Sequence, residues 1–109
     1  MPHPTATFQC ITETEPPCIR LQGRFDLAST STFRQAYLEL MEQAATSALG
    51  IDLAEVIFID SSALGSLLQL RQEASQRQCA ITLDNCSEPV ERVLRIANFT
   101  KLFTLRQTA

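Results

Sequence analysis

The sequence predicts a single α/β domain built on a mixed β-sheet, and two observations support this. From about residue 30 onward, apolar runs typical of strands alternate with segments of helical spacing, as in sheets whose strands are joined by crossover helices. Before that point, two short strands are separated only by a polar, proline-containing turn at 13–17, which favours an antiparallel hairpin. A chain of 109 residues suits one domain, 1–109, and can bury a core without disulfides or metals.

The expected elements follow from periodicity and from turn residues. Strands are expected at residues 8–12, 18–22, 48–53, 79–83 and 102–105, the last at a sheet edge. Gly23 should end the second strand, and the apolar run 56–59 extends or follows the third. Helices are expected at residues 30–45, 63–74 and 89–97. Asp60, Ser61 or Ser62 would cap the second helix, and Asn98 would stop the third.

Composition excludes several classes of function. The net charge is -3 and the only lysine is Lys101, so a basic surface for nucleic acid is not expected. The N-terminus lacks the basic start and apolar run of a signal peptide. No stretch approaches the roughly 18 apolar residues that would span a bilayer. We therefore expect a cytoplasmic protein without membrane insertion.

Metal and cofactor sites are not expected either. The four cysteines form no C-x-x-C pair, and the single histidine, His3, lies near the N-terminus. The cysteines are interpreted as small buried apolar residues in a reducing compartment. The chain has three glycines and no phosphate-binding glycine-rich loop.

The junction at Asp60 is the most informative feature of the chain. A helix N-terminus exposes unpaired N–H groups and a partial positive charge, which suit a bound or covalent phosphate. The small residues Ala63, Gly65 and Ser66 should leave a flat surface that a partner can approach. The simpler interpretation is that Asp60 and Ser61 merely cap the helix. A nucleophilic role for Ser61 would need a neighbouring base, and none is evident, so an enzyme is not expected.

A second acidic residue, Asp26, precedes the first long helix in the run Gly23-Arg24-Phe25-Asp26. By itself it is interpreted as a turn or capping residue. A catalytic carboxylate set drawn from Asp26, Asp52 and Asp60 has no spacing rule to support it. We therefore do not predict one.

Three blocks of the sequence, taken together, resemble the STAS domain family of anti-sigma factor antagonists. The segment IDLAEVIFIDSSALGSLLQLRQEA is similar to the family's central D-S-S-G-L-G block and leucine-rich helix. Upstream, CIRLQGRFDLASTSTFRQAYLEL resembles its second strand, acidic turn and first helix. Downstream, ITLDNCSEPVERVLRIANFTKLFTL resembles its last strand, helix and tail. The resemblance covers about residues 8–105. It implies the STAS fold, a small mixed sheet of four or five strands with helices mainly on one face.

The resemblance also implies a function and a site. The serine after the aspartate is the family's usual phosphorylation site, which places it at Ser61, with Ser62 as the lesser candidate. An anti-sigma factor with serine kinase activity would phosphorylate it, and a PP2C-type phosphatase would restore it. The unphosphorylated form would bind the anti-sigma factor. The implied partner-binding residues are Asp26, Asp60, Ser61, Ser62, Ala63, Leu64 and Gly65.

One residue departs from the family pattern. Ala63 replaces the first glycine of D-S-S-G-L-G, and its methyl group is expected to fill the flat surface slightly and to affect partner choice. Some STAS domains instead serve as subunits of transport systems, including lipid-transport ABC complexes. An alternative function is therefore a docking subunit for an ATPase, without a phosphorylation cycle.

Overall fold

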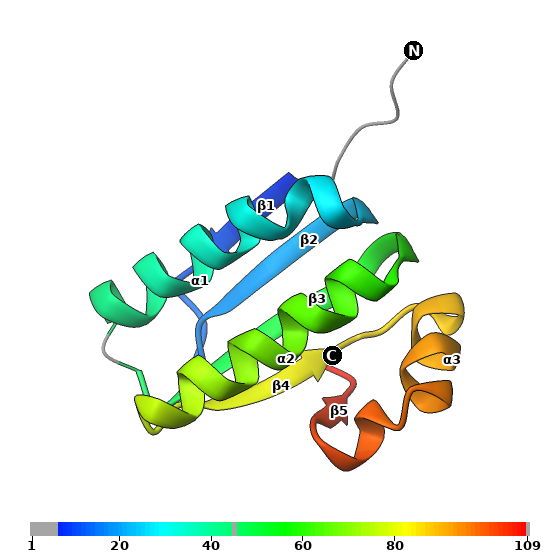
Figure 1. Ribbon diagram of the computed structural model, residues 1–109. Helices are drawn as coiled ribbons and strands as arrows, with labels where there is room; N and C mark the ends of the chain where they lie inside the picture. Colours follow the sequence, from blue (N-terminus) through cyan, green and yellow to red (C-terminus); the bar gives the residue numbers. More distant parts are fainter. Residues whose placement is uncertain (1–6, 45, 109) are drawn as a thin grey trace.

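The computed structural model describes residues 7–44 and 46–108. Its strands form one sheet in the order β1-β2-β3-β4-β5 (Figure 1). β1 is antiparallel to β2, and the other neighbouring pairs are parallel, which confirms the predicted mixed sheet and N-terminal hairpin. The strands are β1 (Thr7–Ile11), β2 (Cys18–Phe25), β3 (Ala48–Ile59), β4 (Ala80–Asp84) and β5 (Thr104–Arg106).

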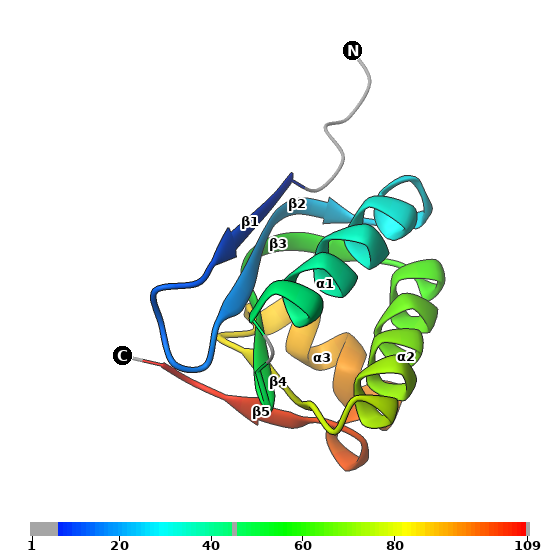
Figure 2. The same ribbon diagram turned by 90° about the vertical axis from the view of Figure 1, so that its left-hand side faces the viewer.

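Each parallel connection contains a helix. Neighbouring parallel strands joined by right-handed crossovers in one direction place those helices on the same face of the sheet. Figure 2 shows α1 and α2 together on one side of the sheet, with α3 beyond them. The helices are α1 (Thr30–Ala44), α2 (Ser61–Gln76) and α3 (Glu88–Ile96), with 3-10 turns η1 (Leu27–Ser29) and η2 (Phe99–Lys101).

The core lies between this face of the sheet and the helices. Alternation along β3 turns Leu49, Ile51 and Leu53 into it, and all three are fully buried. Phe33 of α1 lies edge-on to both Phe25 and Tyr37, with ring centroids 5.0 and 5.2 Å apart. Burying each such side chain contributes roughly 1.5–3 kcal/mol relative to exposing it.

β2 and β3 are longer than the sequence pattern predicts. Gly23 does not end β2 but lies within it at a φ of 97°, beside a shift in the pairing with β3. That left-handed conformation suits glycine and is typical of a β-bulge. The runs 48–53 and 56–59 form one strand, although Ala54 and Glu55 between them are exposed. Pairing with β2 as far as Ile59 keeps β3 extended where the alternation is interrupted.

The helix ends agree closely with the expectations. α3 has Pro89 in its first turn, and Asn98 follows it in the left-handed conformation at φ 62°, as a helix stop requires. The expected end of the first helix, Ala45, lies outside the described residues.

The cysteines do not fit the single interpretation given to them. Cys79 is buried, whereas Cys18 and Cys86 are half-buried and Cys10 is exposed on the outer strand β1. The expectation of four buried thiols is therefore wrong for Cys10, because β1 is an outer strand and, among the described residues, pairs with β2 alone. Burial raises the pKa of the Cys86 thiol to about 11. His3 lies outside the described residues.

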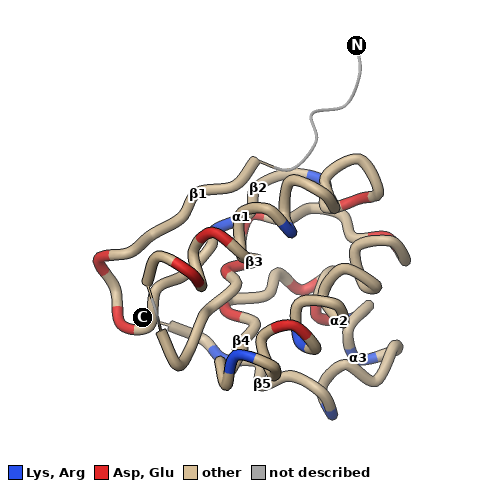
Figure 3. The backbone as a smooth tube through the Cα atoms, turned by 60° about the vertical axis from the view of Figure 1, so that its left-hand side comes forward, with Lys and Arg blue, Asp and Glu red and all other residues tan. Residues whose placement is uncertain are grey.

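Three further observations bear on function. Within the described part of the chain, no helix has the length and apolar character needed to cross a membrane. Residues 7–44 and 46–108 contain no group of three or more histidine, cysteine, aspartate or glutamate side chains arranged to hold a metal ion. Acidic and basic positions are interspersed over the fold rather than gathered on one face (Figure 3).

Candidate functional site

Asp26 and Asp60 lie at the ends of neighbouring strands. Phe25 of β2 pairs with Ile59 of β3, so the two aspartates are the next residues in register. The Asp60 N–H donates to the Phe25 carbonyl at 3.3 Å, and the Leu27 N–H donates to Asp60 Oδ2 at 3.3 Å. Asp26 therefore lies between two residues that are both bonded to Asp60. The fold brings the two acidic residues together at the carboxyl end of parallel strands, where α/β sheets commonly bind ligands.

Asp60 caps α2 by itself. Its Oδ1 accepts a hydrogen bond from the Ala63 N–H at 2.9 Å, and its carbonyl accepts one from Leu64 at 3.1 Å. Ser61 is the first helical residue and is exposed. Its hydroxyl has no hydrogen-bond partner in the described part of the chain. The capping interpretation is thus right for Asp60 but leaves Ser61 without a structural task.

The surface beside Ser61 differs in part from the expectation. A Cβ added at Gly65 would meet no atom within 4 Å, so this position is open to an approaching partner. Ala63 is fully buried and Ser66 is 6% exposed, since both face inward from α2. The expectation that the Ala63 methyl fills the flat surface is therefore wrong. Any effect of Ala63 on a partner must act through packing, whereas Gly65 is exposed and Leu64 half-buried.

Asp26 is held by its own turn and by one arginine. Its N–H donates to Ser29 Oγ at 3.1 Å, and Ser29 Oγ donates back to the Asp26 carbonyl at 2.9 Å. Arg24 Nε lies 4.0 Å from Asp26 Oδ2, while the Arg24 guanidinium lies over the Phe58 ring, 4.1 Å from its centroid. Sequence reasoning missed Arg24, although its position two residues before Asp26 on an alternating strand could have indicated it.

A hydrogen-bonded network fixes α2 against α1. Arg34 of α1 donates two hydrogen bonds of 3.0 Å to the Glu73 carboxylate, and the Tyr37 hydroxyl donates one of 2.7 Å to Glu73 Oε1. The hydrogen bonds from Arg34 hold the pKa of Glu73 below its usual value. Burial, followed by contact with Glu73, raises the pKa of Tyr37. This network helps to set where α2, and with it Ser61, lies.

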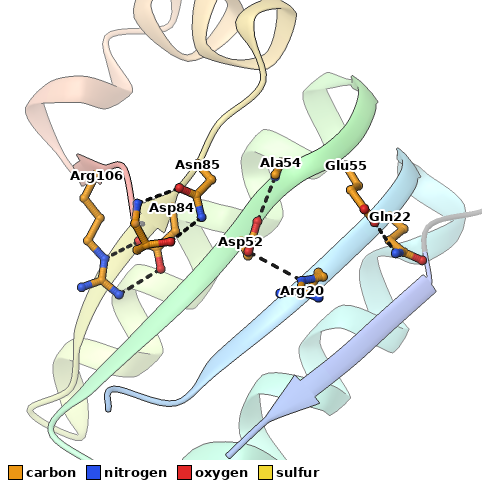
Figure 4. Close-up of polar contacts among 9 residues, drawn as sticks. Arg20, Gln22, Asp52, Ala54, Glu55, Asp84, Asn85 and Arg106 are labelled. Carbon is orange, nitrogen blue, oxygen red and sulfur yellow. Dashed lines mark hydrogen bonds and ion pairs between the residues drawn. The ribbon is translucent and has the colours of Figure 1, made fainter. Parts of the chain in front are cut away.

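A second polar group lies on the sheet face opposite α1 and α2. Arg20, Asp52, Asp84 and Arg106 occupy one register row across β2 to β5 (Figure 4). Arg20 pairs with Asp52 at 3.7 Å, and Arg106 pairs with Asp84 at 2.6 Å. Asp52 is therefore engaged away from Asp26 and Asp60. This row was not predicted from the sequence, because its members come from four separate strands.

One protein-family model matches most of the chain. The family model described as "Mlab, STAS domain" matches residues 11–106. The chain belongs to the STAS domain family. A STAS-domain containing protein of Pseudomonas aeruginosa (strain UCBPP-PA14) is 42% identical to this STAS chain over 89 residues, covering 80% of this chain and 84% of the relative.

Solved structures agree on the STAS fold. An anti-sigma factor antagonist from Mycobacterium paratuberculosis superposes with a TM-score of 0.81 at 20% identity, covering 94% of this chain and 86% of that one. The Bacillus cell fate determinant SpoIIAA in its phosphorylated form gives a TM-score of 0.72 at 21% identity, covering 94% and 92% of the two chains. SpoIIAA in its unphosphorylated form gives 0.70 at 22% identity, covering 94% and 89%. The resemblance to the STAS fold, with its mixed sheet and helices mainly on one face, is confirmed.

Proposed function

We propose that this STAS domain is an anti-sigma factor antagonist whose binding is switched by phosphorylation of Ser61. In this proposal the unphosphorylated domain sequesters an anti-sigma factor with serine kinase activity, and phosphorylation releases it. A PP2C-type phosphatase reverses the modification, and the cycle takes place in the cytoplasm. The observation that carries the proposal is the exposed Ser61 hydroxyl, which lies beside a helix cap whose side-chain hydrogen bond is made by Asp60 and not by Ser61.

The position of Ser61 suggests how such a switch would work. A phosphate on Ser61 adds about -1.5 to -2 charges at pH 7. The partial positive charge at the start of α2 favours these charges, so the modified domain should stay folded. The effect must then arise between molecules, where the phosphate joins Asp60 and Asp26 in a surface that loses water on binding. Because desolvating an unpaired ion costs several kcal/mol and about 1.4 kcal/mol is tenfold in affinity, the charge is enough to release a partner.

The proposed contact surface comprises the exposed or half-buried residues of the junction. Gly65 admits a partner backbone, Leu64 offers apolar area, and Ser62 is the second candidate for modification. Structural neighbours support the switch by analogy, since SpoIIAA has been solved in both an unphosphorylated and a phosphorylated form.

A second candidate function is a docking subunit of a transport complex. The family model that matches this chain carries the description "Mlab, STAS domain" and does not mention an anti-sigma factor antagonist. In this case the same surface around Asp60 and Gly65 would bind an ATPase subunit, as in lipid-transport ABC systems. Ser61 would then serve as a contact residue without being phosphorylated.

Intact-mass spectrometry separates the two functions. The protein is incubated with ATP and any kinase-like protein encoded beside its gene, and the product is mapped by peptide sequencing. The proposal expects one added phosphate on Ser61, retained in Ser62→Ala and absent from Ser61→Ala. Phosphate found on Ser62 alone would identify Ser62, and not Ser61, as the phosphorylation site. No addition to either serine would favour the transport subunit.

Binding measurements test the mechanism itself. Ser61→Asp is expected to weaken binding to the same kinase-like protein by at least tenfold, a loss of about 1.4 kcal/mol. Ser61→Ala should bind like the unmodified protein, because the hydroxyl has no structural task. Equal affinity of both variants would contradict the switch.

A further inference from the structure

β1 is an outer strand without the usual protection of a sheet edge. Within residues 7–44 and 46–108 it pairs with β2 alone, in a continuous register, and its residues Thr7–Ile11 include no charged side chain and no proline. Natural edges usually carry charges, prolines, bulges or very short strands, which prevent pairing with another chain. The opposite edge, β5, has three residues and carries Arg106. β1 therefore has the length and composition of a strand that can accept a neighbour.

A hollow of about 470 Å³ lies between this edge and α1. Its walls include Phe8 and Cys10 from β1 and Ala36 and Glu39 from α1. Phe8 is half-buried and stacks on Phe33 beneath it, with ring centroids 6.0 Å apart. A strand added to β1 would place every second side chain over this hollow, because strand side chains alternate between faces.

We propose that the occupant is β1 of a second copy of this chain, paired antiparallel about a two-fold axis at Gln9. This register pairs all five residues of the strand. Phe8 of each copy faces Cys10 of the other above the hollows, and Thr7 faces Ile11 on the opposite side of the sheet. No like charges meet within the strand pair, and an antiparallel pair of identical strands is self-complementary as a two-fold axis requires.

The resulting dimer has one continuous sheet of ten strands, five from each copy. A pair of five-residue strands with flanking helices is small for a protein interface, so a concentration-dependent dimer is expected rather than an obligate one. Figure 2 shows α1 between β1 and α2, so the Ser61 surface at the start of α2 stays accessible. The dimer would thus present two such surfaces, and its existence does not depend on the proposed function.

Sedimentation equilibrium of the full chain under reducing conditions tests the dimer. From about 5 µM to about 500 µM the average mass should rise from the monomer value of 12.1 kDa toward twice that value. Gln9→Lys places two ammonium groups opposite each other at the axis and should hold the mass at the monomer value. Gln72→Lys, the same change on an exposed residue of α2, should dimerise like the unmodified chain.

Hydrogen exchange locates the contact independently of any variant. Amides of β1 should become at least tenfold better protected at the higher concentration, while those of β5 stay unchanged. Circular dichroism establishes that Gln9→Lys is folded before its mass is interpreted. A monomer over the whole range would overturn the proposal. So would a dimer that a folded Gln9→Lys variant forms equally well, because that dimer must use another surface.

Discussion

Arg106 donates two hydrogen bonds to the carboxylate of Asp84, at 2.6 and 3.0 Å, across the neighbouring strands β5 and β4. The Asp84 side chain is only 4% exposed although it lies on the face that α1 and α2 leave uncovered. The contact raises the pKa of Arg106 through the hydrogen bonds and charge of Asp84. It ties a three-residue edge strand to the sheet and gives a buried carboxylate its counter-ion.

Replacing Arg106 should therefore destabilise the domain through Asp84. In Arg106→Met the buried carboxylate loses its partner, and a buried acceptor left unpaired usually costs about 1–3 kcal/mol. Arg20→Met is the matched control, since Arg20 is 41% exposed and 3.7 Å from Asp52. Urea unfolding should show the larger loss for Arg106→Met. Equal losses of unfolding free energy in the two variants would mean that the pair of Arg106 and Asp84 stabilises the domain no more than the pair of Arg20 and Asp52.

Two glycines should respond oppositely to the same substitution. A Cβ on Gly50 would overlap Asp84 Oδ2, whereas one on Gly65 meets nothing within 4 Å. Overpacking typically costs about 1–3 kcal/mol, so Gly50→Ala should unfold at lower denaturant. Gly65→Ala should stabilise the exposed helix by up to about 1 kcal/mol. Chemical denaturation of both variants measures this difference, and a neutral Gly50→Ala would contradict the close packing of Asp84.

The pH dependence of stability should report on Glu73. The pKa of Glu73 is lowered in the folded state, so as the pH falls this carboxylate is protonated in the unfolded chain before it is protonated in the folded one. The stabilisation is therefore present above the ordinary glutamate pKa of 4.5 and is lost as the pH falls through the lowered value. Glu73→Gln should lose less unfolding free energy than the unmodified protein between pH 7 and about pH 3. Glu42→Gln, on an exposed residue outside this network, should keep the original slope.

Helix capping should depend on Asp60 and not on Ser61. Asp60→Ala removes the bonds from Ala63 and Leu27 and should cost about 0.5–2 kcal/mol. Ser61→Ala removes an exposed hydroxyl without an internal partner and should change stability by less than about 0.5 kcal/mol. Thermal unfolding of the two variants compares them directly. A large loss for Ser61→Ala would assign that hydroxyl a structural role after all.

Most of the fold follows from local patterns. Alternation located the strands and helical spacing located the three helices. Pro89 in the first turn of α3 and Asn98 after its end lie where expected. The bulge at Gly23 and the unbroken β3 were not predictable in this way. Both result from pairing between β2 and β3, which a single sequence does not display.

The site was predictable only in part. The order Asp60-Ser61 before an amphipathic segment indicated a helix start, but not which side chain would be the cap. The direction of Ala63 depends on which face of α2 packs inward, and here that face includes Ala63 and Leu67. The contact between Asp60 and the Leu27 N–H joins residues 33 positions apart, so it could emerge only from the folded chain.

The bonds that shape the junction are made by Asp60 and by main-chain groups of Phe25, Leu27 and Ala63. The side chains of Leu27 and Ser61 are exposed, and a side chain added at Gly65 would meet nothing within 4 Å, so these positions take little part in holding the strands and helix together. Evolution can therefore exchange these side chains at small cost in stability. One scaffold can acquire new binding preferences while keeping the geometry around Ser61 intact.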